Sequence, residues 1–375
     1  MINQERILQE FMELVSIDSV SRKERLVADK LKEKLAAIGL RVEEDGTGER
    51  EGSSAGNVIG HLEGNTPGPA LMFMAHMDTV EPGVGINPVI RDGVVYSQGD
   101  TILGADDKAG IVAVLEALRV IMEHKLPHPK IEAVFTVMEE TGLLGAKNLE
   151  LNRVSPDYVF VLDNVSAAGG IYTKGPAQNS VDVTIRGRAA HAGGNPEDGI
   201  SAIQVAADAI SRMRLGRIDE ETTANLGVIN GGTATNIVCE TIHIKGEARS
   251  RNMEKLNAQT KHMVNLFQEA ATKFGARAHI ATELIYPLMD VGETEPMVSI
   301  CVDAAKAVGI EPAILATGGG SDTNILIGRG LNCVNLGVGM QKPHTTDEFI
   351  AVEDLYLSAR YILAIIAEAV KRGTK

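Results

Sequence analysis

Polar residues follow several short apolar runs of the chain, at the point where each run ends. The runs ALMFMA (70–75), IEAVFTVM (131–138) and DYVFVL (157–162) are bounded by turn or polar residues, which is typical of buried strands. Ligands of open α/β sheets bind at the carboxyl ends of strands, so we expect the polar residues to share one crevice. They are His76, Asp78, Glu139, Glu140, Asp163 and, in the loop after VNLGVG (334–339), His344. Asp106 and Asp107 join them at the start of a predicted helix.

This combination of residue types suits metal chemistry. Two histidines and several carboxylates are ligands for a borderline-soft divalent ion such as zinc. The excess of carboxylates over imidazoles also suits two ions that share a bridging carboxylate, as in hydrolytic two-metal sites. Each residue has an ordinary alternative. A lone His at a strand end is more often structural, the Asp pair can cap a helix, the Glu pair can be solvated, and Asp163 can belong to a turn.

The elements that would position these residues alternate between strand and helix, which predicts an α/β sheet. Residues 4–15, 22–38 and 108–123 have helical patterns. Ser21 is a candidate cap for the second of these helices, and Gly39 is expected to end it. Residues 44–56 are polar and rich in Gly and Ser, and we expect a loop there.

A second unit is predicted between the apolar runs. Its order is strand 178–187, helix 199–213, strands 224–230 and 240–249, helix 254–274 and strand 277–285. This β-α-β-β-α-β order is ferredoxin-like. Helix 298–308, a Gly-rich loop at 318–320, strand 333–338 and helix 353–371 follow it. We therefore predict a mixed sheet flanked by helices, with residues 1–176 and 288–375 forming one domain and 177–287 inserted into it.

Composition excludes several functions. The 375 residues carry 36 Lys and Arg against 50 Asp and Glu, a net charge of −14, and they include no Trp. Such a chain is poorly suited to nucleic acids or anionic membrane surfaces. The third Gly of a dinucleotide fingerprint is missing after Gly339, which argues against a nucleotide-dependent enzyme. Ser321 is outside a G-x-S-x-G elbow, which argues against a serine hydrolase. The odd, scattered Cys239, Cys301 and Cys333 indicate buried thiols in a reducing compartment, and we expect a cytoplasmic protein.

Five short motifs, in this order, resemble those of the M20 family of co-catalytic zinc peptidases. They are HMDTV (76–80), GADDKAG (104–110), EETG (139–142), GGGSD (318–322) and PHTTDE (343–348), with Asp163 between the third and fourth. The resemblance covers essentially the whole chain and implies a zinc-exopeptidase-like fold whose inserted unit serves as a lid and dimerisation domain. It also implies a cis peptide bond between Asp106 and Asp107.

The resemblance assigns roles to the clustered residues. It implies two zinc ions per subunit, which cobalt or manganese can replace, with Asp106 as the bridging ligand. Glu139 would be the general base toward a water between the ions, and Asp78 would hydrogen-bond the second nitrogen of His76. One ion would be held by His76, Asp106 and Asp163, and the other by Asp106, Glu140 and His344.

Three residues of the inserted unit are implied to bind substrate. His191 lies in AHAGG (190–194), and in the family this His reaches the active site of the partner subunit of a homodimer. Asn236 ends GGTATN (231–236), and Arg249 ends a predicted strand, where the family places an Arg that binds the substrate carboxylate. Without the resemblance, the sequence favours His191 as a loop residue next to a flexible Gly pair, and Arg249 is equally well explained as half of a surface ion pair.

The activity that the resemblance implies is removal of the N-terminal residue of short peptides, as by a tripeptide aminopeptidase. A zinc carboxypeptidase or an N-acyl-amino-acid deacylase of the same fold is the first alternative, because the same amide chemistry serves all three. A non-catalytic metal- or ligand-binding dimer is a further alternative. The intact Glu139 argues against it, since a binding protein needs no general base.

Overall fold

Two compact units make up the computed structural model, which describes residues 1–373. The first unit comprises Met1–Thr173, Val291–Ala316 and the described chain from Ser321 onward, and the second comprises Lys174–Asp290 and Thr317–Gly320. The second unit is thus inserted into the first. The predicted boundaries at 176/177 and 287/288 lie close to these limits, and the structure adds the segment 317–320 to the second unit.

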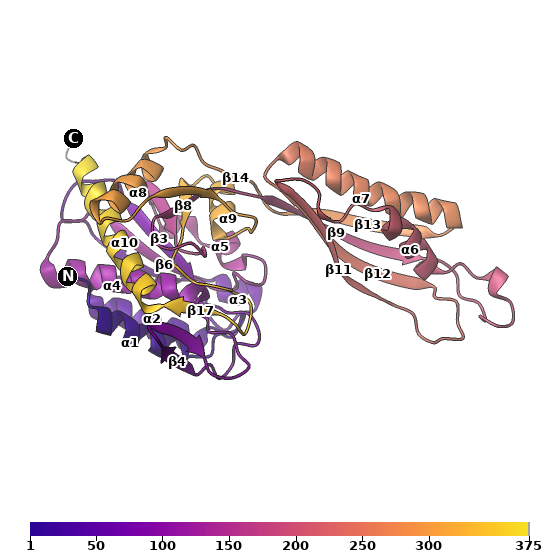
Figure 1. Cartoon of the computed structure of the whole chain (residues 1–375), viewed down its shortest axis with the longest axis horizontal. Coiled ribbons are helices and arrows are strands. Elements are labelled where there is room, and N and C mark those ends of the chain that lie inside the picture. Colours follow the sequence, from indigo (N-terminus) through magenta and orange to yellow (C-terminus); the bar gives the residue numbers. More distant parts are fainter. Residues whose placement is uncertain (374–375) are drawn as a thin grey trace. The chain divides into compact units, whose positions relative to one another are not determined.

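A mixed sheet occupies the centre of the first unit (Figure 1). Its strands are hydrogen-bonded in the order β1-β2-β6-β3-β7-β16-β8-β14, and β15 also pairs with β8. Their bounds are β1 Arg41–Glu44, β2 Val58–Leu62, β3 Leu71–His76, β6 Ile131–Thr136, β7 Tyr158–Val161, β8 Gly170–Gly175, β14 Met289–Asp290, β15 Ala313–Ala316 and β16 Cys333–Leu336.

Neighbouring parallel strands bring the chemically important residues to one edge of this sheet. β3 pairs in parallel with both β6 and β7. Every residue of β3 and β6 is buried, as expected for strands covered on both faces. His76 ends β3, whereas Glu139 follows β6 and Asp163 follows β7. Because parallel strands end at the same edge, these three residues, far apart in sequence, lie together.

Helices flank the sheet and bury their apolar faces against it. The central helix α4 (Ala105–His124) is buried along most of its length and packs against β3 and helices α1 and α10. In α1, Ile7, Phe11 and Leu14 recur at helical spacing and form its buried face. The bounds of the other helices are α1 Gln4–Val15, α2 Arg25–Ile38, α5 Leu144–Asn148, α8 Pro296–Ala307, α9 Asp322–Gly328, α10 Val352–Gly373 and the 3₁₀ turn Leu151–Arg153.

Two expectations for the N-terminal region are wrong. The segment predicted as a loop contains the short helix α3 (Thr47–Glu51), beside which the buried Asp45 carboxylate accepts hydrogen bonds from the backbone N–H groups of Thr47 and Asn57. Such local hydrogen bonding leaves no apolar periodicity in the sequence. Ser21 does not cap α2, because that helix begins only at Arg25 and the Ser21 hydroxyl donates to Asp78 instead.

The first unit also contains a small antiparallel sheet that was not predicted from the sequence. It has the order β17-β5-β4, with β4 Pro88–Arg91, β5 Val94–Ser97 and β17 Phe349–Ala351. β17 directly follows the segment that carries His344. The hairpin of β4 and β5 turns at Asp92 and Gly93, both with positive φ.

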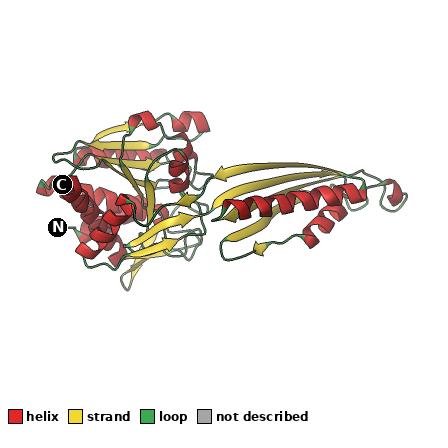
Figure 2. Cartoon of the chain, turned by 90° about the horizontal axis from the view of Figure 1, so that it is seen from above, coloured by secondary structure: helices red, strands yellow, loops and turns green. Residues whose placement is uncertain are grey.

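The second unit is a five-stranded antiparallel sheet with two helices along one face (Figure 2). The strand order is β10-β11-β12-β9-β13, and together with the β-α-β-β-α-β chain order it confirms the predicted ferredoxin-like arrangement. Val181, Val205 and Phe267 are among the buried residues between sheet and helices. The bounds are β9 Ala177–Arg186, α6 Ala202–Arg212, β10 Gly216–Arg217, β11 Thr222–Gly231, β12 Thr241–Ser250, α7 Met253–Phe274, β13 Arg277–Tyr286 and the 3₁₀ turn Pro196–Asp198.

The three cysteines are free and buried, as predicted. Burial raises the pKa of the Cys301 thiol to about 12. The cytoplasmic location inferred from these thiols stays a prediction. Among residues 1–373, no helix has both the length and the apolar character needed to cross a membrane.

Candidate metal centre

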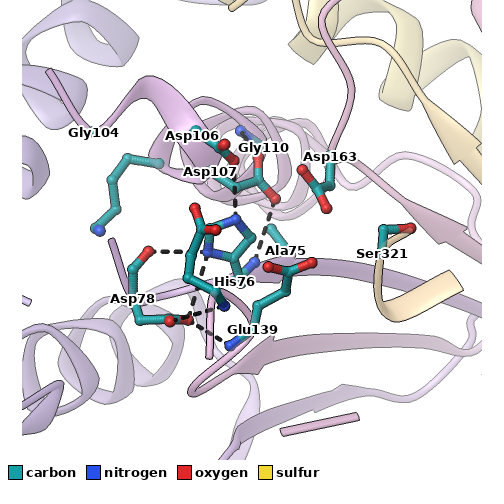
Figure 3. A network of polar contacts seen from close by, with 12 residues as sticks. Ala75, His76, Asp78, Gly104, Asp106, Asp107, Gly110, Glu139, Asp163 and Ser321 are labelled. Atoms are coloured by element: carbon teal, nitrogen blue, oxygen red, sulfur yellow. Dashed lines mark hydrogen bonds and ion pairs between the residues drawn. The ribbon is translucent and has the colours of Figure 1, made fainter. Parts of the chain in front are cut away.

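His76 lies buried at the centre of a cluster of carboxylates (Figure 3). Its Nδ1 is 2.9 Å from the backbone carbonyl oxygen of Asp78, and its Nε2 is 2.9 Å from Oδ1 of Asp106. A carbonyl oxygen only accepts hydrogen bonds, so Nδ1 carries a proton in either charge state of the ring, and whenever the ring is neutral the lone pair lies on Nε2. His76 can therefore offer Nε2 to a cation.

The Asp78 carboxylate supports a different group from the one predicted. Its nearer oxygen lies 3.6 Å from Nδ1 of His76, which is too far for a hydrogen bond. The acceptor that fixes the imidazole is therefore the main-chain carbonyl oxygen of Asp78. The carboxylate instead accepts the backbone N–H groups of Glu139 and Glu140, at 2.9 and 3.2 Å, and the Ser21 hydroxyl at 2.6 Å. Asp78 thus orients both the imidazole and the loop that carries the two glutamates.

Asp106 faces both imidazoles, with one carboxylate oxygen toward each. Oδ1 is 2.9 Å from Nε2 of His76, and Oδ2 is 3.2 Å from Nε2 of His344. Burial would raise the pKa of Asp106, but the hydrogen bonds from His344 and His76 hold it well below its usual value. The peptide bond between Asp106 and Asp107 is cis, as the family resemblance implied.

Asp107 also lies in the cluster, as expected from its place beside Asp106, although the family resemblance assigns it no role. Its Oδ1 accepts the backbone N–H of Gly110, so the helix-capping alternative holds for this residue and not for Asp106. Its Oδ2 accepts the backbone N–H of His76. Burial and the negative charge of Asp163 raise the pKa of Asp107 well above its ordinary value.

Glu139 and Glu140 point to different parts of the cluster. Oε1 of Glu140 lies 2.9 Å from Nε2 of His344. The carboxylate of Glu139 is buried beside His76 (Figure 3), and within residues 1–373 it has no hydrogen-bond partner. Burial and the negative charge of Asp163 raise the pKa of Glu139 well above its ordinary value. Glu139 therefore offers, next to the cluster, a carboxylate that is free to accept a proton.

Asp163 and His344 complete the set of predicted ligands. Asp163 is held by its backbone N–H, which donates to Oδ1 of the buried Asn335 at 3.2 Å. The side chain of His344 is 55% exposed, and its backbone has a φ of 63°. Its hydrogen bonds to Asp106 and Glu140 raise the pKa of His344 to about 10.

The donor set fits divalent metal ions. His76, Asp106 and Glu140 offer ligand atoms that lie within 4.8 Å of one another, and so do His76, Asp107 and Asp163. Imidazole nitrogen and carboxylate oxygen are both zinc ligands. Buried carboxylates at this density are costly without a cation. The ammonium of the buried Lys108 donates its hydrogen bonds to the Ser19 hydroxyl and the Met77 carbonyl and not to these carboxylates.

These two groups differ from the predicted division of ligands between two ions. All five predicted ligands lie in the cluster, but Asp107 rather than Asp106 accompanies His76 and Asp163 in the second group. Which carboxylate bridges two ions therefore remains a proposal. Asp106 and Asp107 are adjacent and identical in type, so the sequence alone does not show which of them accompanies Asp163.

The remaining predicted site residues belong to the second unit. His191 is exposed, and its Nδ1 accepts the backbone N–H groups of Gly193 and Gly194 at 3.1 and 2.9 Å. The carbonyl oxygen of Asn236 accepts the N–H of Ala192, so His191 and Asn236 lie on adjacent backbone segments. The sequence placed these residues 45 positions apart with no sign of this pairing.

Arg249 lies in β12 and is already paired. Its Nε and Nη2 donate to the two carboxylate oxygens of Glu247 at 2.8 and 2.9 Å, and Gln178 also donates to Glu247. The ion-pair alternative is thus present in the structure. A planar fork held in this way still has donors on its other side for a carboxylate ligand.

Comparison with known proteins agrees with the motifs. The model of peptidase family M20/M25/M40 matches residues 72–368. The protein YqjE of Bacillus subtilis is 45% identical over 371 residues, which are 99% of this chain and 100% of that protein. These matches confirm the predicted resemblance along the chain.

Two solved structures give the same result. The crystal structure of aminopeptidase PepT from Bacillus cereus has 45% identity and a TM-score of 0.90, and the match covers 98% of this chain and 99% of that one. A tripeptidase from Staphylococcus aureus has 41% identity and a TM-score of 0.95, with 99% and 100% covered. The resemblance to tripeptide aminopeptidases is therefore confirmed as well.

Proposed function

The chain belongs to peptidase family M20/M25/M40, and we propose that it is a metal-dependent tripeptide aminopeptidase that hydrolyses the N-terminal peptide bond of short peptides. The observation that carries this proposal is the buried Glu139 carboxylate, which lies uncommitted beside two groups of metal-ligand atoms. The two similar structures described as an aminopeptidase and a tripeptidase support the substrate class.

We propose two zinc ions per subunit as the cofactor, replaceable by cobalt or manganese. Asp106 would bridge them, because its two oxygens already face two different imidazoles. When bound, such ions acidify a water molecule and polarise the scissile carbonyl. The other ligands would be His76 and Asp163 for one ion, and Glu140 and His344 for the other.

Glu139 then acts as the general base and afterwards as the general acid. Its carboxylate would take the proton of the attacking water and pass it to the leaving amine. Burial suits this role, because a carboxylate removed from water is a stronger base than an exposed one. The Asp78 carboxylate accepts a hydrogen bond from the backbone N–H of Glu139 and so fixes the position of this base.

His191 would stabilise the oxyanion that develops on the substrate carbonyl. Because its Nδ1 accepts two backbone N–H groups, the proton of the neutral ring lies on Nε2. An exposed Nε2–H is a donor of the kind an oxyanion needs. We propose that it is supplied to the site of a partner subunit.

A homodimer through the second unit is the assembly we propose. Within residues 1–373, the end of β11 is an open sheet edge beyond its pairing with β10, since β10 pairs only with Thr223 and Ala224. Val228 and Ile229 on this segment are 45% and 54% exposed. An open edge with exposed apolar side chains favours pairing with a second copy of the same strand.

Subunit mixing tests whether His191 acts across the dimer. We expect His191→Ala and Glu139→Gln dimers to be nearly inactive alone and to regain activity when mixed under conditions of subunit exchange. A hybrid holds one site with both residues intact, so random exchange restores at most about a quarter of wild-type activity. If hybrids form, as shown by native mass spectrometry, and no activity returns, His191 does not act in the partner's site.

A peptide panel tests which end of the substrate is bound. The panel contains di-, tri- and tetrapeptides and N-acyl amino acids, each assayed with zinc, cobalt or manganese restored. We expect free tripeptides to be cleaved after the first residue and N-acetylated tripeptides to be poor substrates. A free amine held near the metal ions and a carboxylate held by Arg249 would favour one length, because a buried unpaired charge costs several kcal/mol.

Arg249→Met should raise KM for tripeptides far more than for their C-terminal amides. Arg251→Met is the matched control, because Arg251 follows on the same segment but is bonded to the Glu220 carbonyl. Faster turnover of acetylated peptides or N-acyl amino acids than of free tripeptides would contradict the aminopeptidase assignment. The deacylase or carboxypeptidase alternative would then replace it, with the same cluster and the same Glu139.

A further inference from the structure

Glu348 is a buried carboxylate whose partners are all backbone N–H groups near the metal-ligand cluster. It is 1% exposed and directly precedes β17. Its Oε2 accepts the N–H groups of Leu103 and Gly104 at 2.8 and 2.7 Å, and its Oε1 accepts the N–H of Asp106 at 2.9 Å. Both carboxylate oxygens are therefore used on one short segment, 242 to 245 residues away in sequence.

Among the described residues, the N–H groups of Leu103, Gly104 and Asp106 have no other acceptor. The first N–H groups of a helix lack intrahelical partners, and Gly104, the residue before α4, has a φ of 75° and provides no side-chain cap. The backbone of Asp106 and Asp107 is also non-helical. Glu348 thus supplies from a distant part of the chain the acceptors that the start of α4 lacks.

Glu348 is also hydrogen-bonded to the segment that carries His344. The N–H of Glu348 donates to the carbonyl oxygen of Thr345, which closes a turn directly after His344. Nε2 of His344 in turn contacts Oδ2 of Asp106 at 3.2 Å. The two segments are therefore joined twice, once through the carboxylate of Glu348 and once through the side chains of His344 and Asp106.

We propose that Glu348 is a positioning residue that holds the Asp106 segment against the His344 segment and thereby sets the affinity for divalent metal at these two residues. This inference rests on the proposed metal-dependent function. It concerns binding and not the chemical step, because within residues 1–373 the Glu348 carboxylate accepts hydrogen bonds from backbone N–H groups only. Its effect is transmitted through the backbone of Asp106.

A glutamine cannot replace this carboxylate. In Glu348→Gln the side chain keeps one acceptor oxygen, and its amide NH₂ group faces an N–H donor, so at least one buried donor loses its acceptor. An aspartate keeps both oxygens but is one methylene shorter, so we expect it to reach only part of the segment. The order of metal affinities should be wild type, then Glu348→Asp, then Glu348→Gln.

Metal titration of the full-length apoprotein tests the proposal without using activity. Zinc would be titrated in competition with a chelator of known affinity, and cobalt would be followed by its visible absorption. We expect Glu348→Gln to weaken binding of at least one ion by about 10- to 100-fold, which is the usual effect of removing an outer partner of a metal ligand. At saturating metal, kcat should recover to within a few-fold of wild type.

Asp347→Asn is the matched control, because this exposed neighbour undergoes the same change of charge and should bind metal as the wild type does. The circular dichroism and thermal unfolding of each apoprotein show whether it is folded. If Glu348→Gln does not fold, the same titration with Glu348→Asp decides the question, with weakened binding expected. Wild-type metal affinity in a folded variant overturns the proposal. If the wild type itself binds no divalent ion, it is the proposed function that fails.

Discussion

We expect the replacement of Glu139 by Gln to lower kcat by about 10²- to 10⁴-fold, the range that general acid–base catalysis supplies. The amide cannot take a proton from water at neutral pH, yet it has nearly the size and shape of the carboxylate. The backbone N–H of residue 139 still donates to Asp78, so the loop should keep its place. KM for a tripeptide should change far less than kcat, because Glu139 is proposed to act only in the chemical step.

Two measurements make this result specific. Elemental analysis should find the same metal content in Glu139→Gln as in the wild type, since Glu139 is proposed to be no ligand. Glu63→Gln, an exposed position with the same chemical change, should retain wild-type turnover. Turnover near the wild-type value in Glu139→Gln would remove this residue from the role of base.

The edge of the sheet on which the cluster lies could be predicted because its strands are short, apolar and parallel. β3, β6 and β7 are recognisable as buried runs, and each is followed by a polar residue at its carboxyl end. Because neighbouring parallel strands have their carboxyl ends at the same edge of the sheet, the residues that follow them must lie together. The prediction needed only local sequence and one topological rule.

The residues that hold the cluster in place could not be predicted in this way. Glu348 reaches a segment 242 residues away, and Ser21 donates to Asp78 across 57 residues. Locally, Ser21 has the features of a helix cap, and Glu348 ends a polar stretch without periodicity. A contact between distant parts of the chain leaves no local pattern, so only the fold reveals it.

The second unit shows the same contrast. Its long strands and helices have regular periods and could be identified one by one. The pairing of the His191 segment with the Asn236 segment could not, because both are irregular and rich in Gly. Arg249 lies where the family resemblance placed it, at the end of a strand, but only the fold shows that its side chain pairs with Glu247.

Removing the metal ions should abolish activity altogether, and removing one ligand should separate the two ions. We expect a chelator to inactivate the enzyme and added zinc, cobalt or manganese to restore it. His344→Ala should lower the bound metal from two per chain toward one. His344 is the exposed imidazole of the cluster, and within residues 1–373 its ring pairs only with Asp106 and Glu140, so the ligands around His76 and Asp163 should remain in place.

His124→Ala is the control for this change, because His124 is an exposed histidine at the far end of α4. It should keep both the metal content and the activity of the wild type. Unchanged metal content in His344→Ala would exclude His344 as a ligand, whatever happens to the rate. The two active-site variants then distinguish the two roles in the cluster: Glu139→Gln should lose catalysis and keep its metal, whereas His344→Ala should lose catalysis because it loses metal. A loss of metal in both would place Glu139 among the ligands and leave the reaction without its proposed base.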